Sequence, residues 1–233
     1  MNYSTKTGVA AGLFWLVCGT AQAQQLAPNL QLSGFGSMGV NHASNDSGFF
    51  KDTEQGLNFK SDSLVGLKFD FTVNEKAEAS IQLLSKGAND WSADVEWAYL
   101  GYAIAPELKL RAGKLRLPLF VYSDYLDSRF SLPWVRPPQE VYSVIPTSGY
   151  TGAELNYENR IAELQFTAQV YTGEATPDNL VTGASSELSE LRGTTLSLAG
   201  EYLTLRASYA RANIQLGIGD EGVIPAGQYE GSA

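Results

Sequence analysis

The chain has 233 residues, a formal net charge of −9, one cysteine and one histidine. The acidic balance argues against nucleic acid as a partner. The single cysteine, Cys18, excludes a framework of disulfides and a zinc–thiolate site. Because His42 is the sole histidine, a Ser-His-Asp triad and a histidine-rich metal site are disfavoured as well. We therefore expect no metal, no cofactor and no enzyme activity.

The first 23 residues have the features of a secretory signal peptide. Lys6 gives a basic start, residues 8–18 form an apolar stretch, and small residues stand at Ala21 and Ala23. The apolar stretch is shorter than the roughly 18 residues that a membrane-spanning helix requires. We expect residues 1–23 to be removed on export, which leaves residues 24–233 as one domain.

The dominant pattern after the leader is an alternation of apolar and polar residues with a period of two. In residues 65–73 the odd positions are apolar, and residues 77–83 and 162–170 alternate as clearly. This period predicts β-strands with one apolar face. In residues 108–117 the alternation slips at Gly113, which predicts a β-bulge. About nine strands are expected, over residues 30–40, 65–73, 77–83, 95–103, 108–117, 153–157, 162–170, 196–198 and 203–209.

The connections between the expected strands are short and long in turn. The short ones fall at residues 73–76, 105–107, 158–160 and 200–201, and the long ones at residues 41–58, 85–93, 120–149 and 172–194. A transmembrane barrel has this arrangement, because short turns lie at its periplasmic rim and long loops outside. The predicted fold class is therefore all-β, a transmembrane antiparallel up-and-down β-barrel.

The direction of the apolar face separates this barrel from its alternatives. In a soluble periplasmic β-sandwich that binds a ligand, the apolar face would form the core. The leader and the aromatic residues near strand ends favour the barrel, in which that face contacts lipid. A hydrolase is disfavoured, although Glu154 and Glu163 on adjacent expected strands invite comparison with the paired carboxylates of a retaining glycosidase.

Residues 108–142 carry the most distinctive pattern. Their first part places four cations on the expected lumenal wall: Lys109, Arg111, Lys114 and Arg116. The loop that follows contains four prolines and six aromatic residues, which is too apolar for a flexible surface loop and too rich in proline for a strand. We expect this loop to pack inside another part of the protein.

The same region resembles a known family. The segment AGKLRLPLFVYSDYLDSRFSLPWVRPPQEVY, preceded by DVEWAYLGY and followed by GYTGAELNY, is similar to Gram-negative outer-membrane porins of marine γ-proteobacteria. The resemblance covers roughly residues 31–213. It implies a sixteen-stranded, homotrimeric outer-membrane channel for passive diffusion of small hydrophilic solutes and ions.

The resemblance also implies roles for individual residues. The loop after the fifth strand, at about residues 118–149, would fold into the barrel and narrow the pore. The four cations of residues 109–116 would line a basic wall. The charged residues of the constriction loop would be Asp124, Asp127, Arg129, Arg136 and Glu140. Which of these face the pore, and which ions they favour, stays open.

The chain departs from this family in its length. Sixteen strands with their loops require more than about 300 residues, whereas about nine strands are expected here. The chain ends in GIGDEGVIPAGQYEGSA, without the aromatic residue expected at the end of the last strand. We therefore expect residues 24–233 to be a C-terminally incomplete barrel domain.

Overall fold

The computed structural model describes most of the chain after the expected leader. The described residues are 24–43, 56–123, 126–128, 138–142, 147–175, 184–218, 222–224 and 228–232. They are almost entirely strand, apart from a 3-10 turn, η1 (Gly87–Asn89), and a short helix, α1 (Gln139–Tyr142). No helix in these ranges is long and apolar enough to cross a membrane. The expected signal peptide lies outside the described residues.

Nine described strands have eight residues or more, and each overlaps one of the nine expected strands. They are β2 (Leu30–Ser37), β5 (Leu64–Thr72), β6 (Ala77–Lys86), β7 (Ala93–Ala105), β8 (Leu108–Arg116), β9 (Gly149–Ile161), β10 (Leu164–Ala175), β11 (Ala184–Ala199) and β12 (Thr204–Ile218). Five short strands were not expected: β1 (Gln24–Ala27), β3 (Asn41–Ala43), β4 (Gly56–Asn58), β13 (Gly222–Ile224) and β14 (Gln228–Ser232). The strand count predicted from periodicity is thus confirmed for the long strands.

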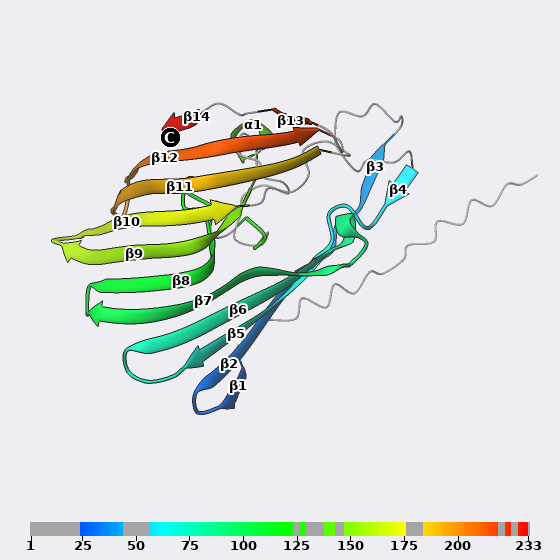
Figure 1. The fold of residues 1–233 in the computed structure, drawn as a ribbon. Helices are drawn as coiled ribbons and strands as arrows, with labels where there is room; N and C mark the ends of the chain where they lie inside the picture. Colours follow the sequence, from blue (N-terminus) through cyan, green and yellow to red (C-terminus); the bar gives the residue numbers. More distant parts are fainter. Residues whose placement is uncertain are drawn as a thin grey trace, which may run out of the picture.

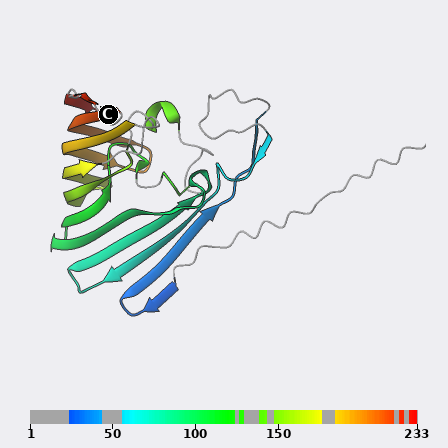
Figure 2. The same ribbon diagram turned by 45° about the vertical axis from the view of Figure 1, so that its right-hand side comes forward.

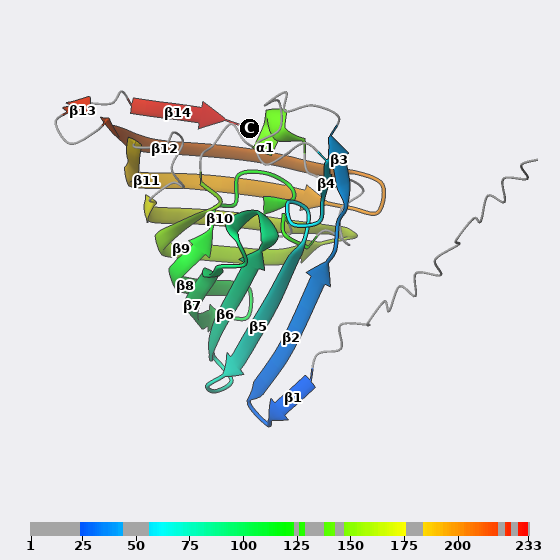
Figure 3. The ribbon, with the colours of Figure 1, turned by 90° about the vertical axis from the view of Figure 1, so that its right-hand side faces the viewer.

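The strands pair in sequence order, and every pairing is antiparallel. The main sheet runs β1-β2-β5-β6-β7-β8-β9-β10-β11-β12-β13, β14 also pairs with β12, and β3 and β4 form a separate pair. This confirms the all-β, up-and-down fold class. The sheet curves like part of a barrel wall, with α1 and the described residues directly after β8 on its concave side (Figures 1 and 2). Over the described residues it stays open, with β1 and β2 far from β12 and β14 (Figure 3).

The turn between β9 and β10 lies further along the chain than expected. The alternation predicted a turn at residues 158–160, but β9 continues to Ile161 and the turn is formed by Ala162 and Glu163. Ala162 has a φ of 55°, the left-handed conformation that tight hairpins require. This register pairs Ile161 with Leu164 and so keeps the apolar residues of both strands on one face.

Because the turn is shifted, Glu154 and Glu163, the two carboxylates compared above with those of a glycosidase, lie far apart on the hairpin. Glu154 pairs across the sheet with Tyr171, whereas Glu163 lies in the exposed turn at the far end of the hairpin. The two side chains do not face each other on adjacent strands. The expectation behind that alternative is therefore wrong.

The β-bulge expected at Gly113 is also wrong. The register passes through this residue without a shift, because Gly113 pairs with Tyr99 on one side and Gly152 on the other. A Cβ atom at Gly113 would lie 2.3 Å from the carbonyl oxygen of Ala98, and the φ of 138° is one that side chains rarely adopt. The glycine is thus required by close approach of the strands rather than by an inserted residue.

The two faces of the sheet have the opposite polarity to those of a soluble protein. On the concave face Gln82 and Glu154 are only 3% and 2% exposed, whereas on the convex face Leu100 and Val170 are 67% and 57% exposed. A soluble sandwich would cover the apolar face with a second sheet. In the described part of the chain, the second sheet is only the short β3–β4 pair. This polarity supports the barrel over the sandwich.

Candidate functional site

The concave face carries the candidate site, because the loop after β8 folds back onto it. The hydroxyl of Thr195 and the guanidinium of Arg206 each donate to the carbonyl oxygen of Pro118 at 2.7 Å. The hydroxyl of Ser208 donates to the carbonyl oxygen of Leu119 at 2.9 Å. The start of the loop is therefore attached to β11 and β12, although 77 to 89 positions separate the bonded residues.

Apolar packing reinforces these hydrogen bonds. Leu117 and Leu119 are buried in a cluster with residues of β8 to β12, and Phe120 packs against its edge. The other members are Leu115, Tyr150, Tyr171, Ala175, Leu188, Leu191, Ala210 and Ala212. Fully burying one leucine side chain contributes about 1.5–3 kcal/mol. The prediction that this apolar loop packs inside the protein is confirmed for its first residues.

Arg116 connects the wall of the sheet to the loop. At the end of β8 it forms a salt bridge with Asp127 of the loop and another with Glu96 of β7, the latter at 3.0 Å. It also donates to the carbonyl oxygen of Ser123 at 3.1 Å, and its guanidinium lies 5.6 Å from the ring centroid of Trp97. Since Arg116 is buried, these contacts hold one cation in a fixed position between wall and loop.

Asp127 is the loop side of the same connection. Besides Arg116, it forms a salt bridge at 2.8 Å with Lys86 at the end of β6. Burial alone would raise the pKa of Asp127, but the charges of Arg116 and Lys86 outweigh it and hold the pKa below its ordinary value. The carboxylate is therefore charged at neutral pH and joins two different strands.

Arg111 forms a second ion pair on β8, further from the loop than Arg116. Its Nε donates to Glu154 at 2.6 Å, and the hydroxyl of Tyr150 donates to the same carboxylate at 3.0 Å. The guanidinium also lies over the ring of Tyr99, 5.3 Å from its centroid. Glu154 is thus almost completely enclosed by partners of complementary charge or polarity.

The two lysines of the predicted basic wall have different partners. Lys109 lies on the same face as Arg111 and forms a salt bridge with Glu78 at 3.1 Å. Lys114 is three residues beyond Arg111, so it belongs to the other set of alternating positions on the strand. Its ammonium donates to the carbonyl oxygen of Val95 at 2.5 Å. The structure therefore places two cations along the wall and the other two at its loop end.

The acids that neutralise this wall lie on neighbouring strands and were not predicted as its partners. Glu78, Glu96 and Glu154 each pair with one of its cations, whereas the opposing charge was expected on the loop. The sequence does indicate that these three glutamates occupy polar positions on strands next to the wall, and this could have identified them. Lys86 was missed as an anchor of the loop because nothing local in the sequence indicates Asp127 as its partner.

Most of the predicted loop charges cannot be compared with this geometry. Asp124, Arg129 and Arg136 lie outside the described residues, and of Glu140, in α1, only the backbone is described. Among the predicted loop charges, Asp127 is the one whose side chain the structure places. It lies directly against Arg116, one of the predicted cations of the wall.

Two cavities flank the loop on the concave side. One, of about 270 Å³, lies between Pro118 and the wall and is lined by Trp97, Tyr99, Arg111 and Glu154 among others. The other, of about 450 Å³, lies between the loop-side ends of β6, β7 and β8 and the start of β9. Within the described ranges, no group of three His, Cys, Asp or Glu residues is placed to hold a metal ion.

The convex face carries rows of exposed apolar residues. On β10 the outward residues from Leu164 to Val170 are apolar, and the row ends at the exposed Glu174. Seven residues span about 20 Å along a strand, and because the strands of transmembrane barrels are tilted by about 35–45°, this row accounts for about 15 Å of an apolar band roughly 25 Å tall. An antiparallel up-and-down sheet with this band outside and polar residues inside defines a transmembrane β-barrel protein.

Comparison with known proteins identifies the family. The family model for Gram-negative porins matches residues 8–229, and the chain belongs to this family. Membership places the chain in the outer membrane. An outer membrane protein of Vibrio cholerae, OmpT lacking loop L8, is similar in structure, with 12% sequence identity and a TM-score of 0.33. The match covers 82% of this chain and 64% of that one. No curated protein sequence matches the chain.

Proposed function

We propose that this chain forms part of the wall of a water-filled channel for passive diffusion of small hydrophilic solutes and ions. The observation that carries the proposal is the inverted polarity of the sheet, with charged and amide side chains on the concave face and apolar ones outside. A concave polar face inside a closed barrel is in contact with water. Because the described sheet is open, the proposal requires further strands to close it.

The loop after β8 is the proposed constriction, at about residues 118–149. Its first residues are attached through Pro118 and Leu119 to β11 and β12, which lie three and four strands along the sheet from β8. A loop that crosses the inside of a barrel narrows the water-filled space. Arg111 and Lys109 on one wall, with their partner acids, would then create a local field that favours polar solutes and biases ion flow.

We also propose how the protein is exported and assembled. A leader over residues 1–23 would be cleaved during export, and residues 24–233 would belong to the barrel domain. Membership of the porin family supports assembly as a homotrimer. The convex face would contact outer-membrane lipid, and the protein would catalyse no reaction.

Ion selectivity in planar bilayers tests the channel. The complete gene product is refolded in detergent, its fold is checked by heat-modifiable migration, and its reversal potential is measured in a salt gradient. Lys109→Gln removes a cation from the wall and is expected to shift selectivity toward cations, whereas Glu78→Gln is expected to shift it toward anions. Lys76→Gln, in the exposed turn after β5, is the matched control and should leave selectivity unchanged.

The opposite signs of the two shifts are the discriminating result. A folded protein that inserts but conducts no ions would refute the channel. A channel in which both substitutions act like the control would retain the conductance but refute the assignment of this face to the pore.

A further inference from the structure

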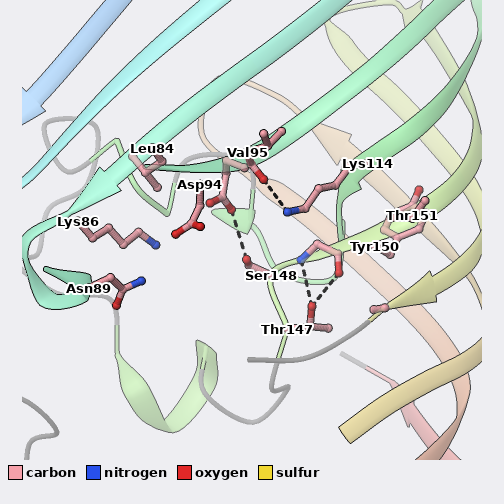
Figure 4. Close-up of a pocket in the computed structure, with 13 residues that line it drawn as sticks. Leu84, Lys86, Asn89, Asp94, Val95, Lys114, Thr147, Ser148, Tyr150 and Thr151 are labelled. Carbon is pink, nitrogen blue, oxygen red and sulfur yellow. Dashed lines mark hydrogen bonds between the residues drawn. The ribbon is translucent and has the colours of Figure 1, made fainter. Parts of the chain in front are cut away.

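The larger cavity is bordered by charges of both signs. Figure 4 shows Lys86 and Asp94 directed into it from β6 and β7, with Lys114 on β8 reaching toward the same strand end. Its volume of about 450 Å³ lies in the range of small-molecule sites. Two lysines and two acids, Asp94 and Glu96, line it, so its formal charge is balanced.

These charges are not equally available to a solute. Glu96 is occupied by Arg116 and accepts from Ser148 at 3.3 Å, and Lys86 is occupied by Asp127. By contrast, the Asp94 carboxylate has no hydrogen-bond or salt-bridge partner among the described residues, and neither does the amide of Asn89 (Figure 4). Asp94 is therefore the available anion of this cavity.

Lys114 is the available cation. Its ammonium donates to the carbonyl oxygen of Val95, the residue directly after Asp94. No salt bridge joins Lys114 to Asp94, although both border the same cavity. A carboxylate is a stronger acceptor than a neutral carbonyl, so a solute carboxylate can take the ammonium from Val95. The cavity thus offers one anion and one cation that do not neutralise each other.

We propose that this cavity binds zwitterionic solutes of amino-acid or short-peptide size, with the solute ammonium on Asp94 and its carboxylate on Lys114. A solute of single charge is attracted by one of these groups and opposed by the other, and an uncharged sugar gains from neither. The inference names a solute class for the proposed channel and rests on that function for the route by which solutes reach the cavity.

Equilibrium dialysis against the folded chain in detergent tests the site without requiring conduction. The probes are alanylalanine, its N-acetyl form, which keeps only the negative charge, its amide, which keeps only the positive charge, and glucose. Alanylalanine is expected to bind about tenfold more tightly than either blocked form, as one charge-assisted hydrogen bond in a partly exposed site gives. Glucose is expected to bind more weakly still.

Two substitutions assign each end of the peptide. Asp94→Asn should weaken alanylalanine about tenfold. It should not weaken the N-acetyl form, because it removes a like charge that opposes that probe. Lys114→Gln should weaken alanylalanine similarly and should not weaken the amide, for the same reason. The matched controls are Glu107→Gln and Lys76→Gln, in exposed turns at the opposite rim, which should change neither. Circular dichroism confirms that each variant keeps its strand content.

The outcomes separate this site from the channel. Equal binding of all probes, tighter binding of glucose, no binding of alanylalanine, or variants that act like their controls would each overturn the zwitterion site. If the charge pattern is found but bilayers show no conductance, the site stands and the channel fails. If the channel conducts and the charge pattern is missing, the site alone fails.

Discussion

Asp127→Asn is the substitution most informative about the loop. The side chain of Asp127 is 11% exposed and that of Arg116 is 5% exposed, so both charges are largely removed from water. The substitution leaves the shape of the side chain nearly unchanged but removes the charge that Arg116 and Lys86 share. It should therefore weaken the attachment of the loop to the wall while the strands keep their pairing.

The contacts set the magnitude of this effect. Breaking a buried ion pair by removing one partner costs about 3–5 kcal/mol. Arg116 keeps its salt bridge with Glu96 and its bond to Ser123, and Lys86 is partly exposed, so the cost should fall to about 2–3 kcal/mol. That corresponds to attachment weakened by about 30- to 150-fold.

Amide hydrogen exchange measures the attachment. In the docked loop the amide of Leu117 donates to Ser148, and the amide of Ser123 donates to Phe120. Both should exchange faster by the same factor in the variant. Asp90→Asn is the matched control, because Asp90 is also a loop aspartate paired with a lysine but is 89% exposed, so its loss should cost less than about 1 kcal/mol.

The reasoning is refuted if Asp127→Asn accelerates exchange no more than Asp90→Asn does. It is also refuted if exchange accelerates equally across the strands, because the substitution would then act on the whole sheet. The first outcome would mean that the apolar cluster beneath the loop holds it without help from the ion pair.

Three further predictions follow from the same structure. First, acid should release the loop. Because the pKa of Asp127 is lowered in the folded state, its stabilisation of the docked loop is complete above about pH 4 and is lost as the pH falls through the folded-state pKa. Amide exchange of the loop in Asp127→Asn should lack this pH dependence. Second, Gly113→Ala should destabilise the sheet by about 2 kcal/mol or more in urea unfolding, since its Cβ would meet a carbonyl oxygen at 2.3 Å, whereas Gly36→Ala, with its nearest atom at 3.5 Å, should cost much less. Third, Leu100→Arg should lower the stability measured by refolding into phospholipid vesicles by about 2–4 kcal/mol, and Tyr202→Arg, in an exposed turn, by less than about 1 kcal/mol; equal effects would mean that the convex face does not contact lipid.

The sequence by itself determined the strands and the character of the loop. Period-two alternation is local information, because each strand shows its own apolar face within about eight residues. For the same reason the tight turn at residues 105–107 was located correctly. The dense prolines and aromatic residues after Arg116 likewise predicted that the loop packs inward, since such a composition is costly to leave in water.

The sequence failed where the answer depends on a neighbouring strand. The turn after β9 was misplaced by a few residues, because the pairing of Ile161 with Leu164 decides where β9 ends. Gly113 was interpreted as a bulge, because the close approach of the Ala98 carbonyl is invisible in the chain itself.

Only the tertiary structure decided which face is outside and which charges meet. An alternating strand has the same sequence whether its apolar side faces a second sheet or lipid, and the exposure of residues such as Leu100 distinguishes the two. The pairing of Arg111 with Glu154, 43 positions away, and of Lys86 with Asp127 likewise depends on strand register and on where the loop docks. Electrostatic partners are chosen by distance in space, and that distance is set by the folded sheet rather than by any local pattern.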